Sequence, residues 1–223
     1  MNSKKLSCLI AGLLLSSASA AADFSFLGTF SEDDDVQVFS FNVGATSNVT
    51  LRSLGYAGGV NSTGLTIPRG GFDTILALFN GSGTLIDSND DGGPGTVPAD
   101  AGTGQNWDAY LQTTLVPGNY QVSVMQFDNF ANGPNLSNGF FREGSGNFTA
   151  DFGCGGPAFC DISGVTPFDQ RNNQWAFDVL NVNSATGSGP VPAIPEPETY
   201  AMLIAGLGLL GFVTRRRKPE CLA

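Results

Sequence analysis

The sequence predicts an all-β protein whose strands form a two-layer antiparallel β-sandwich. Apolar and polar residues alternate in several short segments, which is the pattern of strands with one buried face. Turn-forming residues separate these segments, and the chain contains 30 Gly and 17 Phe among its 223 residues. No segment of the body shows apolar residues at helical spacing. Two sheets packed face to face are the arrangement that buries one face of each.

The expected strands follow one another along the body. In chain order they are residues 36–43, 48–54, 74–79, 109–115, 120–125, 147–152 and 174–182. The inward side chains should be Phe39, Phe41 and Val43, then Val49 and Leu51, and finally Trp175, Phe177 and Val179. Residues 74–79 are continuously apolar, as expected of a central strand. Pro117 and Gly118 are typical of a turn, so 109–115 and 120–125 are predicted to form a hairpin.

The N-terminal segment, residues 1–22, has the three parts of a secretory signal peptide. Lys4 and Lys5 give a positive start, residues 6–15 are apolar, and residues 18–20 form a small-x-small cleavage pattern. The mature chain should therefore begin near Asp23 and form one domain over residues 23–183, which is long enough for a real core. Residues 184–198 are rich in Gly, Ser and Pro and are predicted to be a linker.

The C-terminal segment predicts a membrane anchor. Residues 199–214 carry no charge and would extend about 24 Å as a helix at roughly 1.5 Å per residue. A comfortable span needs about 20 residues, so this one is short. The basic residues of the tail, 215–223, should stay in the cytoplasm by the positive-inside rule. They are Arg215, Arg216, Arg217 and Lys218.

The tripeptide Pro195-Glu196-Pro197, the short span and the basic end together resemble the PEP-CTERM sorting signal. That resemblance implies a Gram-negative producer with an exopolysaccharide matrix, and an exosortase-type transpeptidase as partner. It also implies transient anchoring in the inner membrane during export, followed by release to the cell surface or the exterior. A short permanent anchor is the alternative reading.

The body is strongly acidic. Residues 23–183 contain 17 Asp and Glu, four Arg and no Lys, and the whole chain has no His. Such a surface repels the phosphate backbone, so nucleic acid is not expected as a partner. Without His or Lys in the body, nucleophilic sites built on a Ser-His-Asp, Cys-His or Ser-Lys set cannot form. Only chemistry between two carboxylates remains for an enzyme.

Two cysteines of the body, Cys154 and Cys160, are predicted to form a disulfide. Five residues with Gly and Pro lie between them, and an oxidising compartment favours the bond. Two thiolates without His do not complete a zinc site.

The best candidate for a metal site is the segment 87–92. Asp87, Asn89 and Asp91 follow the spacing of the first half of a calcium loop, and Gly92 permits a sharp turn. Pro98 stands where such a loop would carry its glutamate, so the remaining oxygens must come from elsewhere. The expected donors are Asp33, Asp34 and Asp35. The alternative is a turn whose Asx side chains bond their own backbone.

The body also resembles a second family. The segments 71–80, 85–92 and 115–120 are similar to the bacterial pre-peptidase C-terminal domain over roughly residues 30–130. This resemblance implies a jelly-roll-like sandwich that serves secreted peptidases as an accessory module, in some cases calcium-dependent or substrate-adhering. Here no peptidase precedes it.

Aromatic residues also occur in loops, at 127–133 and 138–141. They could stack on sugar rings or plug the ends of the sandwich. We therefore expect an exported, non-enzymatic protein of the cell surface or matrix, structural or adhesive and associated with polysaccharide. The alternative is a secreted hydrolase or the accessory module of one.

Overall fold

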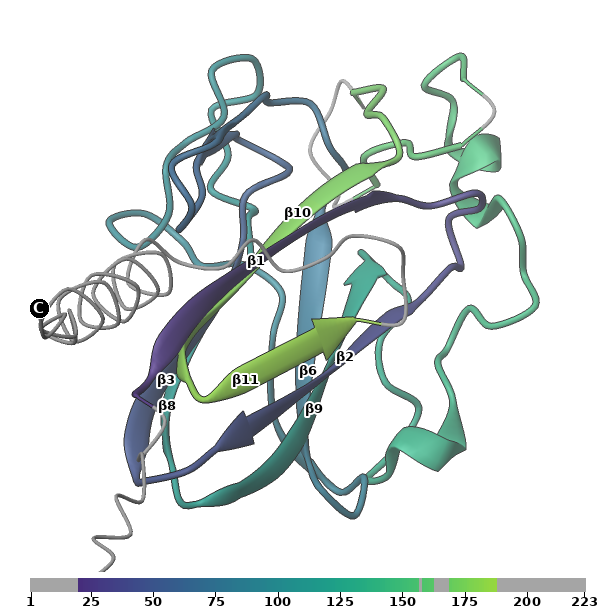
Figure 1. Ribbon diagram of the computed structural model, residues 1–223. Helices are drawn as coiled ribbons and strands as arrows, with labels where there is room; N and C mark the ends of the chain where they lie inside the picture. The colour runs from purple at the N-terminus through teal and green to yellow at the C-terminus, as the bar shows by residue number, and fades with distance from the viewer. Residues whose placement is uncertain (1–19, 157, 163–168, 188–223) are drawn as a thin grey trace, which may run out of the picture.

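Two antiparallel sheets pack face to face in the computed structural model, which describes residues 20–156, 158–162 and 169–187 (Figure 1). In spatial order, the first sheet contains β1 (Ala22–Thr29), β10 (Gln174–Val182), β3 (Ser47–Ser53) and β8 (Tyr110–Leu115). The second contains β11 (Ser184–Gly187), β2 (Gln37–Val43), β9 (Gly118–Gln126), β6 (Thr74–Asn80) and β7 (Leu85–Asn89). A small ribbon, β4 (Gly59–Val60) and β5 (Thr66–Ile67), and two 3₁₀ helices, η1 (Leu136–Asn138) and η2 (Phe148–Phe152), complete the described part. The predicted all-β sandwich is confirmed.

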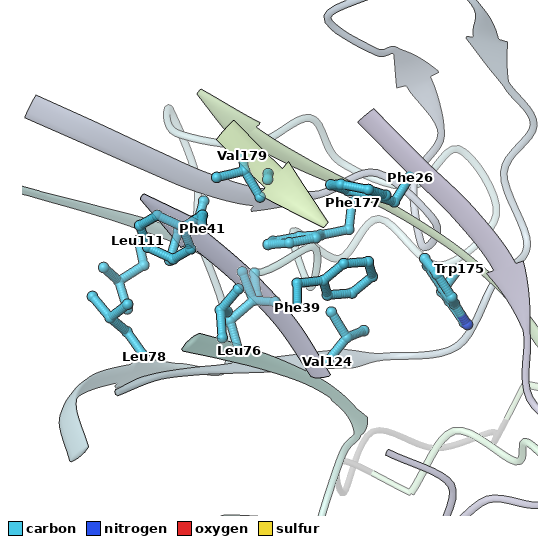
Figure 2. Packing of buried hydrophobic residues seen from close by; sticks show 14 of the residues in the cluster. Phe26, Phe39, Phe41, Leu76, Leu78, Leu111, Val124, Trp175, Phe177 and Val179 are labelled. Carbon is cyan, nitrogen blue, oxygen red and sulfur yellow. The ribbon is translucent and has the colours of Figure 1, made fainter. Parts of the chain in front are cut away.

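The core between the sheets is dominated by aromatic rings. Phe39 of β2 lies against three rings of the other sheet, with centroids 4.6 Å from Phe26, 5.6 Å from Trp175 and 5.0 Å from Phe177. Figure 2 shows these rings together with aliphatic residues from both layers. All the side chains predicted to face inward are buried in this cluster. Alternation in the sequence therefore identified the inner faces correctly.

Strand β6 is buried on both faces, which explains its continuous apolar sequence. It lies between β9 and β7, and its inner side chains Leu76 and Leu78 join the main core. On the outer face, Ile75 and Phe79 join a second cluster, which loop residues cover. A strand whose two faces are both covered by other residues carries apolar side chains on each face, so its sequence does not alternate.

The segments 109–115 and 120–125 are strands, but the predicted hairpin between them is wrong. Strand β8 belongs to the first sheet, where it pairs with β3, and β9 belongs to the second, between β2 and β6. The connection therefore crosses from one layer to the other. It is held by the Tyr120 hydroxyl, which donates to the Val116 carbonyl oxygen at 2.8 Å. A Pro-Gly turn sets the chain reversal but not which strands pair.

Two other segments differ from expectation. Residues 147–152 were expected to form a strand but contain η2, because Asp33 accepts hydrogen bonds from the backbone N–H and the hydroxyl of Thr149. Residues 184–187 were expected to be linker but form β11, which pairs with β2 and buries Ala185 opposite Phe41.

Cys154 and Cys160 form the predicted disulfide, with their Cα atoms 5.6 Å apart. Among the described residues, no helix is long and apolar enough to cross a membrane. The predicted membrane segment, 199–214, lies outside the described residues, as does the predicted signal peptide up to residue 19.

The Phe39 ring should be the most sensitive position of the core. Phe39→Ala removes a ring that contacts three others and leaves a cavity, so it should lower the free energy of unfolding by about 3–5 kcal/mol. Val116→Ala, at a side chain that is 62% exposed, should change it by less than about 0.5 kcal/mol. Urea denaturation of both variants measures the difference, and equal losses would contradict this account of the core.

Candidate functional site

All four arginines of the body are engaged in ion pairs with aspartates. Arg52 pairs with Asp178 at 2.8 Å, Arg69 with Asp100 at 2.5 Å, Arg142 with Asp128, and Arg171 with Asp169 at 3.0 Å. With no Lys or His in the body, the remaining carboxylates must be satisfied by neutral donors, protons or cations.

Several buried carboxylates take neutral donors and so fix loops to the sheets. Asp108 accepts the Ser53 hydroxyl at 2.8 Å and the backbone N–H groups of Tyr56 and Ala57 at 3.0 and 2.8 Å. Burial raises the pKa of Asp108, and these hydrogen bonds oppose that rise. Asp33 is held in the same way by Thr149 and by the Phe159 N–H at 2.6 Å. These carboxylates are structural anchors.

Arg171 and Tyr56 form a buried polar centre at one end of the sandwich. The Arg171 guanidinium lies 3.9 Å from the centroid of the Tyr56 ring and donates to the carbonyl oxygens of Tyr56 and Gly71. The Tyr56 hydroxyl donates to Asp161 at 2.8 Å. Burial would raise the pKa of Asp100, but hydrogen bonds from Arg69 and Thr103 outweigh it and hold that pKa below its ordinary value. The loops at this end are therefore closely tied together.

Three further carboxylates, Asp73, Asp90 and Asp91, converge at the ends of β6 and β7. We call them the carboxylate trio. One oxygen of each lies within 4.8 Å of the others, and among the described residues they form the one such group of three Asp, Glu, Cys or His. Asp73 precedes β6 and the other two follow β7. Because the strands pair antiparallel, with Leu76 opposite Asn89, these positions meet at the same end.

Asp90 of the trio lacks the donors that satisfy the anchors. The Oδ1 atom of Asp90 is buried and has no hydrogen-bond partner among the described residues. Burial, and next the charge of Asp91, raises the pKa of Asp90 to about 7. Burial, and next the charge of Asp161, raises the pKa of Asp91. Two unit charges 4 Å apart repel by about 4 kcal/mol at an effective dielectric constant near 20, so a proton or a cation is needed here.

A buried amide lies at the same end of the β6–β9 pair, on the inner face of the sheet. Gln126 of β9 is the register partner of Thr74, the residue after Asp73, and it is fully buried. Neither its side-chain oxygen nor its side-chain nitrogen has a hydrogen-bond partner among the described residues. An unpaired buried amide is costly, and its inner-face position separates it from the carboxylates of the trio.

The residues predicted for calcium are only partly brought together. Asp91 belongs to the trio, but Asp87 lies exposed on β7 outside it. The Asn89 side-chain oxygen accepts from the Tyr110 N–H at 2.7 Å, and its amide nitrogen donates to the Asp91 carbonyl at 3.2 Å. Asn89 therefore shapes the turn and joins the edges of the two sheets. Gly92 is needed there because a Cβ would lie 2.9 Å from the Asp108 carbonyl oxygen.

The other predicted donors, Asp33, Asp34 and Asp35, lie in different contacts. Asp33 anchors η2, Asp34 accepts from the Gly146 N–H at 2.9 Å, and Asp35 accepts from backbone N–H groups of its own turn. Asp73 and Asp90 were not among the metal ligands predicted from the sequence. The available signal was the apolar run 74–79 followed by Asn80-Gly81 and a second strand, because a hairpin there places Asp73 beside Asp91.

The raised pKa of Asp90 predicts a pH-dependent stability in the presence of a chelator. The folded protein binds this proton more tightly than the unfolded chain, so the free energy of unfolding should fall as pH rises from about 4 to about 7. Asp90→Asn should reduce that fall, since the amide resembles the protonated acid. Asp87→Asn, on the exposed part of β7, should leave it unchanged. Urea denaturation across this pH range tests the pair, and an unaltered slope in Asp90→Asn would contradict the assignment.

The sorting residues lie outside the described part of the chain, but their sequence is informative. Residues 193–218 match a model of the PEP-CTERM protein-sorting motif, and this range includes the Pro195-Glu196-Pro197 tripeptide and all four basic residues of the predicted stop. No curated protein matches the chain. The resemblance of the body to the pre-peptidase C-terminal domain stays a prediction. The chain carries the PEP-CTERM motif, which implies export to the cell surface with an exosortase as the processing partner.

Proposed function

We propose that this protein is a non-enzymatic structural or adhesive component of the cell surface or extracellular matrix, associated with polysaccharide. An exosortase-type transpeptidase cuts it near Pro197 after transient anchoring in the inner membrane. The observation that carries the proposal is the sorting motif behind a sandwich whose buried acids serve the fold.

The use of charge supports a non-enzymatic role. Every arginine of the body is paired, and Asp33, Asp100, Asp108 and Asp178 accept hydrogen bonds that fix loops and strands. Groups held in this way are poor general acids or bases, because protonation would break contacts of the fold.

Calcium at the carboxylate trio is part of the proposal. The trio offers only oxygen donors, and calcium takes six to eight of them at about 2.3–2.6 Å. A divalent cation would offset the repulsion between Asp90 and Asp91 and would tie the end of β7 to the start of β6. Calcium would thereby stabilise an edge of the second sheet in a protein exposed outside the cell.

Calcium should therefore raise the melting temperature of the mature protein. Binding to the folded state alone adds about 2.7 kcal/mol when calcium is a hundredfold above its Kd. Asp90→Asn should abolish the shift, whereas Asp87→Asn should retain it. Differential scanning calorimetry with chelator and with millimolar calcium makes the comparison. The same melting temperature in both conditions would remove the proposed site.

Processing should depend on the acidic tripeptide. In a bacterium that has an exosortase, the secreted protein should lack the residues beyond about Pro197, as measured by intact mass spectrometry. Glu196→Ala should accumulate uncut chain in the membrane fraction, whereas Glu220→Ala, in the basic tail, should be processed normally. Secretion of the full-length polypeptide from wild-type cells would contradict the proposed cut.

One observation favours the alternative, a secreted hydrolase. Asp90, with a pKa raised to about 7, lies beside Asp91, and a protonated acid next to a carboxylate is the arrangement of glycoside hydrolysis. Release of reducing ends from matrix polysaccharide by the wild-type protein, and its loss in Asp90→Asn, would establish the enzyme. Absence of turnover together with calcium stabilisation would support the structural role.

A further inference from the structure

A short ribbon covers the outer face of the second sheet. It consists of residues 130–132 and 139–141, and we call it the aromatic ribbon. The Asn132 N–H donates to the Gly139 carbonyl at 2.9 Å, and the Phe141 N–H donates to the Phe130 carbonyl at 2.9 Å. Ala131 and Phe140 form an antiparallel bridge between these bonds. Phe130 and Phe141 are therefore opposite each other on one face, and Ala131 and Phe140 on the other.

The two faces of the ribbon have different environments. Ala131 and Phe140 pack on the cluster formed by Ile75, Ala77, Phe79 and Met125, so this face completes the outer core. On the other face, Phe130 is 39% exposed and Phe141 is 61% exposed. The loop aromatics thus divide between the two roles that the sequence left open. Phe140 covers the outer hydrophobic cluster, whereas Phe130 and Phe141 are exposed to solvent.

The exposed rings are held in place before any ligand arrives. The buried Asn129 donates to the Asp34 carbonyl at 3.0 Å and accepts from the Arg142 N–H at 2.8 Å. The Arg142 guanidinium lies 5.0 Å from the centroid of the Phe141 ring and 5.0 Å from that of Phe148, and it pairs with Asp128. A surface fixed in this way loses little entropy on binding.

A polar cleft of about 610 Å³ adjoins the ribbon at Gly139 and Phe140, while Phe130 and Phe141 lie on the ribbon outside its lining. The amide of Asn138 and the hydroxyl of Ser137 line it, together with four carboxylates, and the described residues around it include no Lys or Arg. The carboxylates are Glu32, Asp34, Asp35 and Glu143. Such a cleft accepts hydrogen bonds from hydroxyl groups and repels anions.

We propose that the aromatic ribbon and this cleft bind a neutral polysaccharide. The apolar face of a pyranose ring stacks on Phe130 and Phe141, and hydroxyls of the next sugars donate to the amide and carboxylate oxygens of the cleft. The proposal rests on the proposed polysaccharide association and names the surface and the polymer class. The charge of the cleft selects neutral chains over uronate-rich ones.

The chemistry of the surface favours a sugar over a protein. A stable protein interface buries about 800 Å² on each partner around a hydrophobic centre. Here two exposed rings lie on one face of the ribbon, and a cleft of hydrogen-bond acceptors begins at Gly139 and Phe140, a combination that suits a molecule with one apolar face and a rim of hydroxyls. A second copy of the chain is the competing occupant, and its outcome is part of the test.

The test uses the mature secreted protein in affinity electrophoresis through gels that contain a polysaccharide. The probes are hydroxyethylcellulose as a neutral polymer, alginate as an anionic one, and the neutral exopolysaccharide fraction of the producing bacterium. We expect retardation in at least one neutral gel and none in alginate. Phe141→Ala should weaken this binding roughly five- to tenfold, the worth of one aromatic contact.

Three matched variants separate stacking from other effects. Phe141→Tyr keeps the flat ring and should bind as the wild type does. Phe141→Leu keeps an apolar side chain without the ring face and should bind as weakly as Phe141→Ala. Val116→Ala, an exposed apolar residue between β8 and β9, should bind normally.

Each contrary result has a distinct meaning. Equal binding by wild type and Phe141→Ala would overturn the ribbon as the site while leaving polysaccharide association intact. If the wild type binds no neutral polymer, both the ribbon as a binding site and the polysaccharide association are overturned. The proposed exosortase cut is tested independently, by intact mass spectrometry. Sedimentation showing a dimer that Phe141→Ala dissociates, with no sugar binding, would assign the ribbon to a second copy of the chain.

Discussion

The contact of Phe39 with the rings of the opposite sheet is the interaction on which the rest of the structure depends. It joins β2, an interior strand of one layer, to β1 and β10 in the other. The backbone accommodates this packing, because Gly28 lies opposite Trp175 in register and a Cβ there would be 2.1 Å from the indole ring. The spacing of the two layers is thus set by aromatic side chains, and the loops that carry the candidate sites extend from strands fixed by them.

The shortage of cations determines how this domain uses its acids. Since the four arginines are already paired, other aspartates are satisfied by backbone N–H groups and hydroxyls, as at Asp33 and Asp108. This makes carboxylates into loop anchors. The trio at the β6–β7 end differs because its oxygens converge and the buried Oδ1 atom of Asp90 has no hydrogen-bond partner among the described residues, so an external cation would stabilise this place most.

Periodicity in the sequence was sufficient to predict the strands and their inward faces, because burial imposes a strict two-residue alternation on β2, β3 and β10. It did not predict which strands pair. The turn before Tyr120 has the local chemistry of a hairpin, yet β9 is buried on both faces from Val122 to Gln126 and takes β2 and β6 as neighbours. Likewise, η2 exists because of the distant carboxylate of Asp33 rather than because of its own residues.

The candidate site was predictable only in part for the same reason. Local spacing drew attention to Asp91, but its neighbour Asp73 is 18 residues earlier and becomes adjacent only through the pairing of β6 with β7. The three aspartates before β2 were predicted to supply metal ligands, but each of them accepts a hydrogen bond from a backbone N–H group. The spacing of residues in the sequence can identify a candidate loop. Which loops lie next to each other depends on how the strands pair in the folded protein.

The pairing of β1 with β10 joins the beginning of the body to its end, with Phe24 opposite Val179. Neither sheet can be completed until the last strands are available, since β11 also supplies an edge to the second sheet. Closure of this kind is slow, because contacts between residues far apart in sequence must form first. A chain that still lacks β10 and β11 therefore lacks an interior strand of the first sheet and an edge of the second, so neither layer closes until the whole body is present.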